Sequence, residues 1–218
     1  MARSKFSFIL QVVAALVLSA IPILHYPFGW FETLFHELSH GLSAILTGGS
    51  IESIALNYNG SGLCTTSGGN RFLILVSGYT GSACWGFLVY ISVTYTKAHS
   101  VKIIAALLAI LAAFIGILWV RDIVTLSILL VIIIVFSAAY RYGSHQLTRS
   151  FIEFTGIYVV MNAIRSPLYL IDGRDIGDGS ALSELTYIPE IFWVTIWALI
   201  GIAILMLLYQ RSIKPTLT

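Results

Sequence analysis

Charged side chains are scarce in this chain of 218 residues. Only 10% of the residues are Asp, Glu, Lys or Arg, whereas 58% are hydrophobic. Soluble domains carry about 25% charged residues, so the composition excludes an ordinary soluble protein. The net charge is only +2 and is scattered along the chain, which excludes the basic patch that a nucleic-acid partner requires. We therefore expect an integral, multi-pass membrane protein surrounded by a lipid bilayer, without an indication of which membrane.

Cysteine is also rare, with Cys64 and Cys84 as the two examples. Two cysteines so far apart exclude a CxxC site and a disulfide framework. We interpret them as two small buried thiols. The sequence shows no internal repeat, low-complexity tail or inserted soluble module. It therefore predicts a single integral-membrane domain over residues 1–218.

The chain instead contains long runs without charged residues. Roughly 20 apolar residues cross a bilayer as a helix. The first run is too long, and too free of a small-residue cleavage site, for a removable signal peptide, so we expect it to stay as the first membrane helix. The sequence predicts an all-α polytopic membrane protein with about six to seven membrane segments. The charge-free runs are 6–31, 72–96, 103–120, 123–140 and 191–210, and a further segment, 151–171, is interrupted by two charged residues.

Proline and glycine mark boundaries after the first run. Pro22 and Pro27 bracket a predicted break. Residues 30–47 then read as a second helix, which Gly48 and Gly49 end, because glycine just past the last turn is a common helix stop. Further along, Gly78, Ser82 and Gly86 form a stripe of small residues at four-residue spacing, which lets helices approach closely. We interpret that stripe as a packing surface.

The period of the sequence changes after the second helix. Residues 54–58 alternate between large apolar side chains and small or polar ones, and Asn59-Gly60 follows. This dipeptide is a strong signal for a β-hairpin, with residues 63–66 returning as the partner strand. Non-helical backbone at membrane depth is tolerated only where protein or a water-filled cavity covers it. The sequence therefore predicts a short membrane-associated β-hairpin beside a cavity.

The predicted second helix contains the motif HELSH. His36 and His40 are four residues apart and share one helix face, so both imidazoles can bind one metal ion. Glu37 lies beside them, where it can accept a proton from the attacking water as a general base. Ionisable residues inside a membrane segment mark functional sites, although polar residues that pair inside a helix bundle are the alternative. The motif predicts one Zn²⁺ per chain, with Glu37 as the catalytic residue.

A catalytic zinc site needs a third protein ligand. Three other histidines are candidates in principle, but two lie in expected surface loops and the third lies across the proline break. Three of the four aspartates fall within seven residues after a membrane segment, a density that favours them as ligands over a simple polar turn. The histidines are His25, His99 and His145, and the aspartates are Asp172, Asp175 and Asp178.

These motifs resemble those of the M50 group of intramembrane zinc proteases, the site-2 protease superfamily, and most of all its M50B-like branch. The stretch HELSHGLSAILTGGSIESIAL carries the metal motif, a following glycine and a GG-hairpin in the order of the family. The resemblance extends over about residues 16–197. It implies hydrolysis of a peptide bond in or near a transmembrane segment of a membrane-protein substrate.

The resemblance also implies further site residues. The stretch PLYLIDG is similar to a proline-containing LDG motif whose aspartate is the third zinc ligand, which implies Asp172. The stretch DGSALSELTYIPEIFW resembles another block of the M50B-like branch, in which Asp178 is the marked acid. We prefer Asp172 and keep Asp178 as the alternate. Asn162 is similar to a family asparagine and is assigned to substrate binding.

The predicted hairpin offers an edge strand to a substrate. We expect Asn59, Gly60 and Leu63 to contribute to substrate binding, because a locally unwound segment can add to such an edge as a further strand. Two other functions stay open. The chain could be a non-cleaving, zinc-dependent membrane binder, or a transporter of a small ion or solute. Glu37 argues against the first, and the clustering of polar residues at one site argues against the second.

Two membrane orientations are possible. Lys and Arg favour cytoplasmic loops. All the Lys and Arg pairs that flank the predicted helices can be cytoplasmic if the zinc helix and hairpin re-enter and leave on one side, which puts the aspartates outside. The family resemblance instead implies a zinc helix that crosses fully, with the site reached from the cytosol. We favour the family topology for the core.

Overall fold

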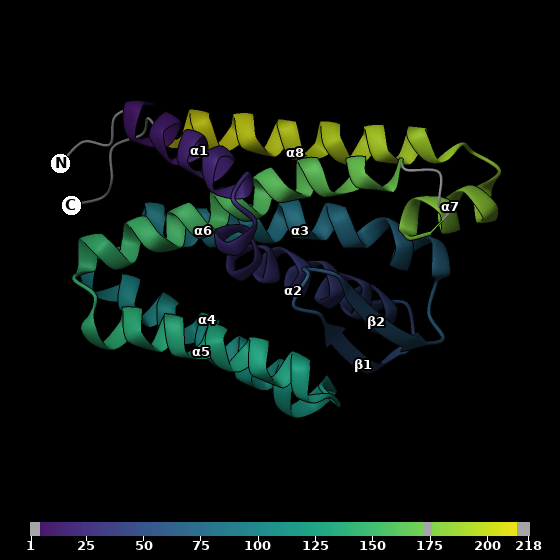
Figure 1. Cartoon of the computed structure of the whole chain (residues 1–218), viewed down its shortest axis with the longest axis horizontal. Helices are drawn as coiled ribbons and strands as arrows, with labels where there is room; N and C mark the ends of the chain where they lie inside the picture. The colour runs from purple at the N-terminus through teal and green to yellow at the C-terminus, as the bar shows by residue number, and fades with distance from the viewer. Residues whose placement is uncertain (1–4, 172–175, 213–218) are drawn as a thin grey trace.

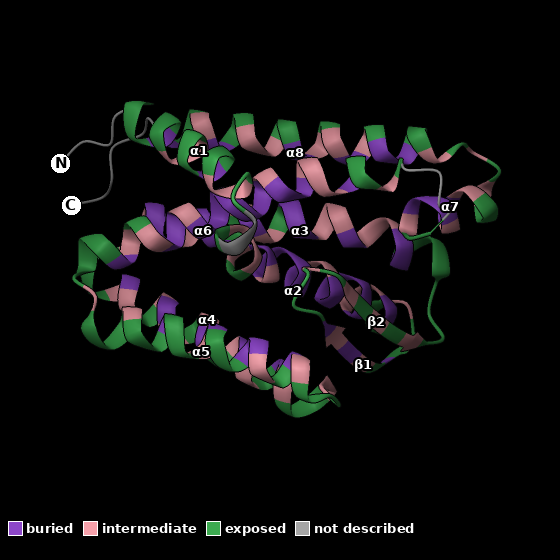
Figure 2. Ribbon diagram, viewed as in Figure 1, coloured by how far each residue is buried: buried purple, intermediate pink, exposed green. Residues whose placement is uncertain are grey.

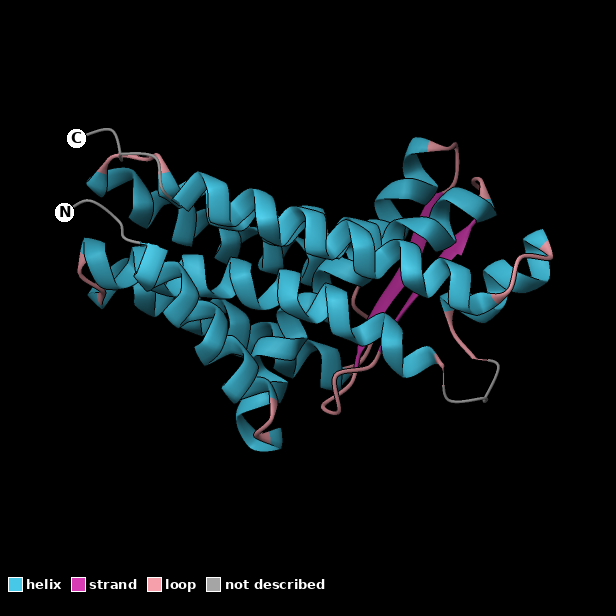
Figure 3. Ribbon diagram, turned by 90° about the horizontal axis from the view of Figure 1, so that it is seen from above, coloured by secondary structure: helices cyan, strands magenta, loops and turns pink. Residues whose placement is uncertain are grey.

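The computed structural model describes residues 5–171 and 176–212, which form a helical bundle with one β-hairpin at one end (Figure 1). Both strands lie at the end of the bundle away from the two termini (Figure 3). The helices are α1 (Lys5–Ser19), α2 (Pro22–Leu46), α3 (Arg71–Thr94), α4 (Ala98–Trp119), α5 (Ile123–Tyr142), α6 (His145–Arg165), α7 (Asp178–Thr186) and α8 (Glu190–Ser212), and a 3₁₀ helix, η1 (Ser166–Leu170), follows α6. The strands are β1 (Ser50–Leu56) and β2 (Gly62–Ser67).

Fewer helices than expected meet the requirements for a membrane span. In the described ranges, α3, α4, α5 and α8 are long and apolar enough, and α1 with α2 would add a fifth span as one bent pair. The predicted count of six to seven is therefore not confirmed. The difference lies partly in α6, which carries Arg149, Glu153 and Arg165 and is too polar to count by composition.

The break predicted inside the first charge-free run is present, and it divides the run between two helices. Helix α1 ends at Ser19, and α2 begins at Pro22 after a bend of 107°. Pro22 has no backbone N–H to donate to a preceding turn, so it suits the start of a helix rather than its interior. The second proline, Pro27, lies inside α2. The break therefore precedes both prolines instead of lying between them.

The hairpin is confirmed, with a longer turn than the Asn59-Gly60 signal indicated. Strands β1 and β2 pair antiparallel with Ile54 opposite Cys64, and a loop of residues 57–61 connects them. Gly60 has a φ of +85°, which favours glycine, and the Asn59 side chain accepts a hydrogen bond from the Ser61 N–H. In the described part of the chain the sheet has only these two strands, so the outer edge of β2 faces no other strand.

Helix α2 contacts α3, α6 and both strands, whereas α4 and α5 lie to one side of it (Figure 2). At the crossing of α3 and α6, a Cβ on Gly86 would lie 2.8 Å from the Gly156 carbonyl oxygen, so the small-residue stripe does permit a close approach. Helix α5 begins at a cap: hydrogen bonds from the Thr125 hydroxyl and backbone N–H lower the pKa of Asp122 below its usual value. Thr125 also bonds the backbone of Leu56, which ties β1 to α5.

Candidate metal centre

Two histidine side chains on adjacent turns of α2 form one side of the site. The Nε2 atoms of His36 and His40 are 2.9 Å apart. His40 is buried and His36 nearly so, because α3 packs against α2 and Asp178 of α7 reaches both rings. The predicted sharing of one helix face therefore brings both ring nitrogens to one point.

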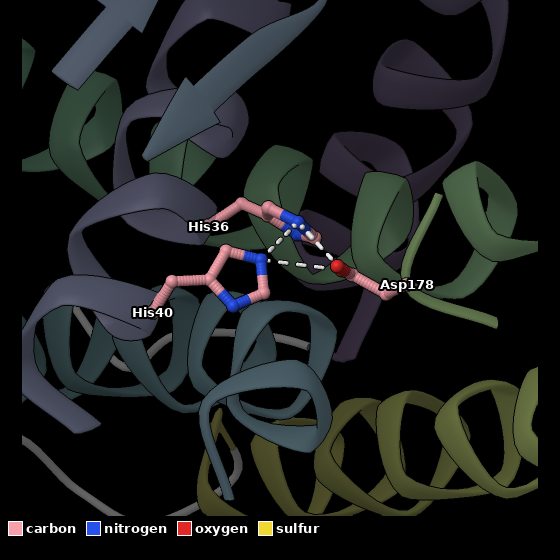
Figure 4. A group of neighbouring side chains, drawn as sticks. All are labelled: His36, His40 and Asp178. Carbon is pink, nitrogen blue, oxygen red and sulfur yellow. Dashed lines mark hydrogen bonds and ion pairs between the residues drawn. The ribbon is translucent and has the colours of Figure 1, made fainter. Parts of the chain in front are cut away.

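Asp178, the first residue of α7, completes the group (Figure 4). Its Oδ2 atom lies 3.1 Å from Nε2 of His36 and 3.2 Å from Nε2 of His40. The three ligand atoms all lie within 4.8 Å of one another, so the group could hold a metal ion. Asp172, the aspartate that we preferred from the sequence, lies outside the described residues, as does Asp175.

A hydrogen bond orients the His40 ring so that its other nitrogen could bind a metal ion. The Nδ1 atom of His40 lies 2.6 Å from the carbonyl oxygen of Ile74 on α3. A carbonyl oxygen only accepts, so Nδ1 carries the proton and the lone pair of Nε2 points at the other two ligand atoms. Metal-binding histidines are usually oriented in this way through their second ring nitrogen.

The spacing of the three atoms suits zinc. Two ligands that are each about 2.0–2.1 Å from one tetrahedral ion lie about 3.3 Å apart, close to the separations between these three residues. Gly78 of α3 provides the room. A Cβ on Gly78 would lie only 2.6 Å from His40 Nε2 and from the Cε1 atoms of both His36 and His40. One member of the small-residue stripe therefore belongs to the site, a role that the packing interpretation missed.

The Glu37 carboxylate lies against the hairpin, whereas the rings of His36 and His40 face Asp178 on α7. The backbone of β2 passes so close that a Cβ on Gly62 would lie 2.5 Å from Glu37 Oε1. The backbone N–H of Cys64 acts on the same carboxylate as a hydrogen-bond donor. One turn earlier, the Thr33 hydroxyl donates to the Gly60 carbonyl oxygen at 2.7 Å. The start of β2 thus holds the Glu37 carboxylate beside the two histidines, and no sequence pattern indicated this role for Gly62.

The residues assigned to substrate binding occupy different surroundings. Asn59 and Gly60 form the hairpin loop, and Leu63 is exposed on the face of β2 that points away from α2. Asn162 is buried in α6, where its side chain hydrogen-bonds Tyr158. The hairpin residues and Asn162 therefore do not share one surface.

The remaining histidines are not part of the group. The Nδ1 atom of His25 lies 2.7 Å from the Tyr158 hydroxyl. His99 contacts Ser100 at the start of α4, and His145 is the first residue of α6. The sequence-based preference for an aspartate over these histidines agrees with this arrangement.

Comparison with known protein families shows which family the chain belongs to. The profile of the family described as Peptidase M50B-like matches residues 9–208, which is nearly the whole chain. The chain belongs to this family. No curated protein and no solved structure gives a match. The Peptidase M50B-like assignment confirms the resemblance seen in the sequence, identifies an integral membrane protein and implies a peptidase.

Proposed function

We propose that this Peptidase M50B-like protein is an intramembrane zinc protease that hydrolyses a peptide bond in or near a transmembrane segment of another membrane protein. The observation that carries the proposal is the position of Glu37, a buried carboxylate next to a His36–His40–Asp178 group of metal-ligand geometry. A binder or a transporter has no need of a base at that place.

Each residue takes one role. His36, His40 and Asp178 would hold a single Zn²⁺, with Asp178 now favoured over Asp172 because its carboxylate reaches both imidazoles. The ion would supply Lewis-acid chemistry, activating water and polarising the scissile carbonyl. Glu37 accepts the proton of the attacking water and passes it to the leaving amine. The N–H of Cys64 steadies the Glu37 carboxylate in the orientation for this transfer.

The outer edge of β2 is the proposed place for substrate. An unwound segment can pair with an unpartnered strand edge through main-chain hydrogen bonds. This edge begins at Gly62, which touches Glu37, so a segment added there would lie next to the base. Leu63 projects from the same strand and would contact substrate side chains. Asn162 is buried, so it would affect substrate binding indirectly, through the residues that surround it.

A comparison of three variants tests the proposal. Purified wild type is mixed with a panel of single-span membrane proteins in detergent, and fragments and bound zinc are measured by mass spectrometry and metal analysis. Glu37→Gln is expected to keep zinc and to lose cleavage by about 10²–10⁴-fold, the usual contribution of a general base. Leu63→Glu is expected to keep zinc and reduce cleavage, because a charge on an edge opposes strand addition.

Glu52→Gln is the matched control, since Glu52 is an exposed carboxylate on β1 outside the site. It should cleave as wild type does. Cleavage by Glu37→Gln at the wild-type rate would disprove the protease mechanism. Unchanged cleavage by Leu63→Glu would disprove only the strand-addition step.

A further inference from the structure

Contacts between helix ends define one end of the bundle, here named the basic end. The Tyr95 hydroxyl, just after α3, donates to the Arg211 carbonyl oxygen near the end of α8 at 2.9 Å. The Lys5 ammonium at the start of α1 lies 5.9 Å from the Tyr209 ring centre on α8. The Arg149 guanidinium near the start of α6 donates to backbone carbonyls at the end of α3. These helix ends therefore lie together, as Figure 1 shows at the side of both termini.

Most of the described basic residues belong to this end. Six of the nine Lys and Arg residues in the described ranges lie in its loops or in the adjoining helix turns. No described Asp or Glu lies in those loops or terminal turns. The basic residues are Lys5, Lys97, Lys102, Arg141, Arg149 and Arg211.

The opposite end, here named the site end, carries the hairpin, α7 and the candidate metal centre (Figure 1). Contacts join its parts: the Trp197 ring N–H early in α8 donates to the Val76 carbonyl early in α3, and Asp178 reaches the histidines of α2. Three described basic residues and five described carboxylates lie in its loops and terminal turns. They are Arg71, Arg121 and Arg165, and Glu52, Asp122, Asp178, Glu184 and Glu190.

The path of the chain keeps these two ends separate. The bent pair α1–α2 runs from the basic end to the site end, and α3 returns. Helices α4, α5, α6 and α8 then alternate in direction, so the described chain begins and ends at the basic end (Figure 1). Because the bent pair crosses only once, the Lys and Arg pairs that flank the helices can lie on one side without a re-entrant zinc helix.

We propose that the basic end faces the cytoplasm, and that the metal centre opens to the opposite side of the membrane. Lys and Arg in short loops set orientation, whereas Asp and Glu contribute little. The loops at the basic end are short, with three residues between α3 and α4 and two between α5 and α6. The family resemblance implied the reverse orientation, with a site reached from the cytosol.

This orientation specifies the substrate. If the proposed protease function holds, the bond to be cut lies in the half of the bilayer away from the cytoplasm, in a helix that can unwind near that surface. The β2 edge, which begins at Gly62 and lies at the site end, would receive it there. The orientation itself rests on charge and chain path alone, so it stands or falls without any cleavage.

Single-cysteine labelling tests the orientation. In a Cys64→Ala, Cys84→Ala background, Tyr187→Cys places a thiol at the site end and Tyr142→Cys places one at the basic end. Both tyrosines are strongly exposed, at 94% and 82%. Intact bacterial cells are treated with a membrane-impermeant maleimide, before or after permeabilisation. Tyr187→Cys is expected to label in intact cells, and Tyr142→Cys only after permeabilisation.

The reverse pattern, or equal labelling of both variants in intact cells, would overturn the proposal. A fluorescent protein that folds only in the cytoplasm, fused after Thr218, gives a second measurement in the unaltered sequence. Because α8 ends at the basic end, the fusion is expected to fluoresce, and a dark but full-length fusion would contradict the orientation. A protein that labels as expected but never cleaves would disprove the protease function and leave the orientation intact.

Discussion

Helix α2 and the α4–α5 pair use the same bilayer in opposite ways. Helix α2 buries Glu32, Glu37 and His40, and each lies against another part of the protein. Helices α4 and α5 bury only small or apolar side chains and one threonine, and they expose large aliphatic residues such as Ile117 and Ile134. Lipid is a suitable solvent for the second surface but not for the first.

The difference shows what a polar residue in this protein requires. Ionisable groups inside a membrane are costly unless protein groups meet them. Around α2 those groups come from the Cys64 backbone N–H, the Ile74 carbonyl and Asp178. Sequence segments far apart must therefore converge on α2, whereas α4 and α5 pack mainly against each other (Figure 1). Substitutions that remove a partner from α2 should have larger effects than matched ones in α4 or α5.

The largest effect is expected from the metal ligands. His40→Ala and Asp178→Ala should each lower bound zinc from about one ion per chain to near zero, because two protein ligands do not complete a site of this type. Asp172→Ala should retain zinc. Asp122→Ala, which removes the carboxylate that caps α5, is the control on the other side of the comparison and should also retain it. Metal analysis of protein purified in detergent gives the result.

The aspartate assignment depends on that pair of variants. Zinc that is lost in Asp172→Ala and retained in Asp178→Ala would show the choice of Asp178 to be wrong. Zinc retained in His40→Ala would remove the metal site itself.

A smaller, more selective effect is expected at Gly62. The Cβ of Gly62→Ala would lie 2.5 Å from Glu37 Oε1 and 2.6 Å from Thr33 Cγ2, so the Glu37 carboxylate must move. Cleavage should fall by at least about tenfold, equivalent to about 1.4 kcal/mol in the barrier. Bound zinc should stay constant, because the atoms nearest to a Cβ on Gly62 belong to Glu37 and Thr33 rather than to His36 or His40. Initial rates over a range of substrate concentrations should show the loss in kcat.

Gly116→Ala in α4 is the matched control. A Cβ there would meet only the end of the Leu129 side chain at 3.4 Å, an ordinary contact. Equal activity in Gly62→Ala and Gly116→Ala would mean that β2 does not position the base.

Local patterns in the sequence predicted the features that arise from local geometry. The four-residue spacing of His36 and His40 placed them on one face, and alternation before Asn59-Gly60 predicted a hairpin. The family motifs named Asp178 only as an alternate, because nothing local joins α7 to α2. The distance between them depends on how α3, α7 and α8 pack, and that packing has no signature in one sequence.

The errors have the same origin. The prolines predicted the break between Pro22 and Pro27, whereas the chain bends just before Pro22, because apolar composition does not report where a helix bends. Gly62 and Gly78 matter through the atoms that approach them, Glu37 and the two imidazoles, which come from another part of the chain. A glycine that makes room for a site looks in sequence like any turn or packing glycine.

The smallest effect is expected from Ile117→Ala, on the exposed face of α4. Ile115 is fully buried, whereas Ile117 is 79% exposed. Ile115→Ala should destabilise the fold by about 2–5 kcal/mol, because it leaves a cavity among packed side chains. Ile117→Ala should cost less than about 1 kcal/mol, since lipid or detergent fills the space as well as a side chain does. Thermal unfolding of both variants in one detergent measures the difference, and zinc content should be unchanged in both. If Ile117→Ala costs as much as Ile115→Ala, the outer face of α4 is covered by protein rather than lipid, and α4 would then resemble α2 in needing partners.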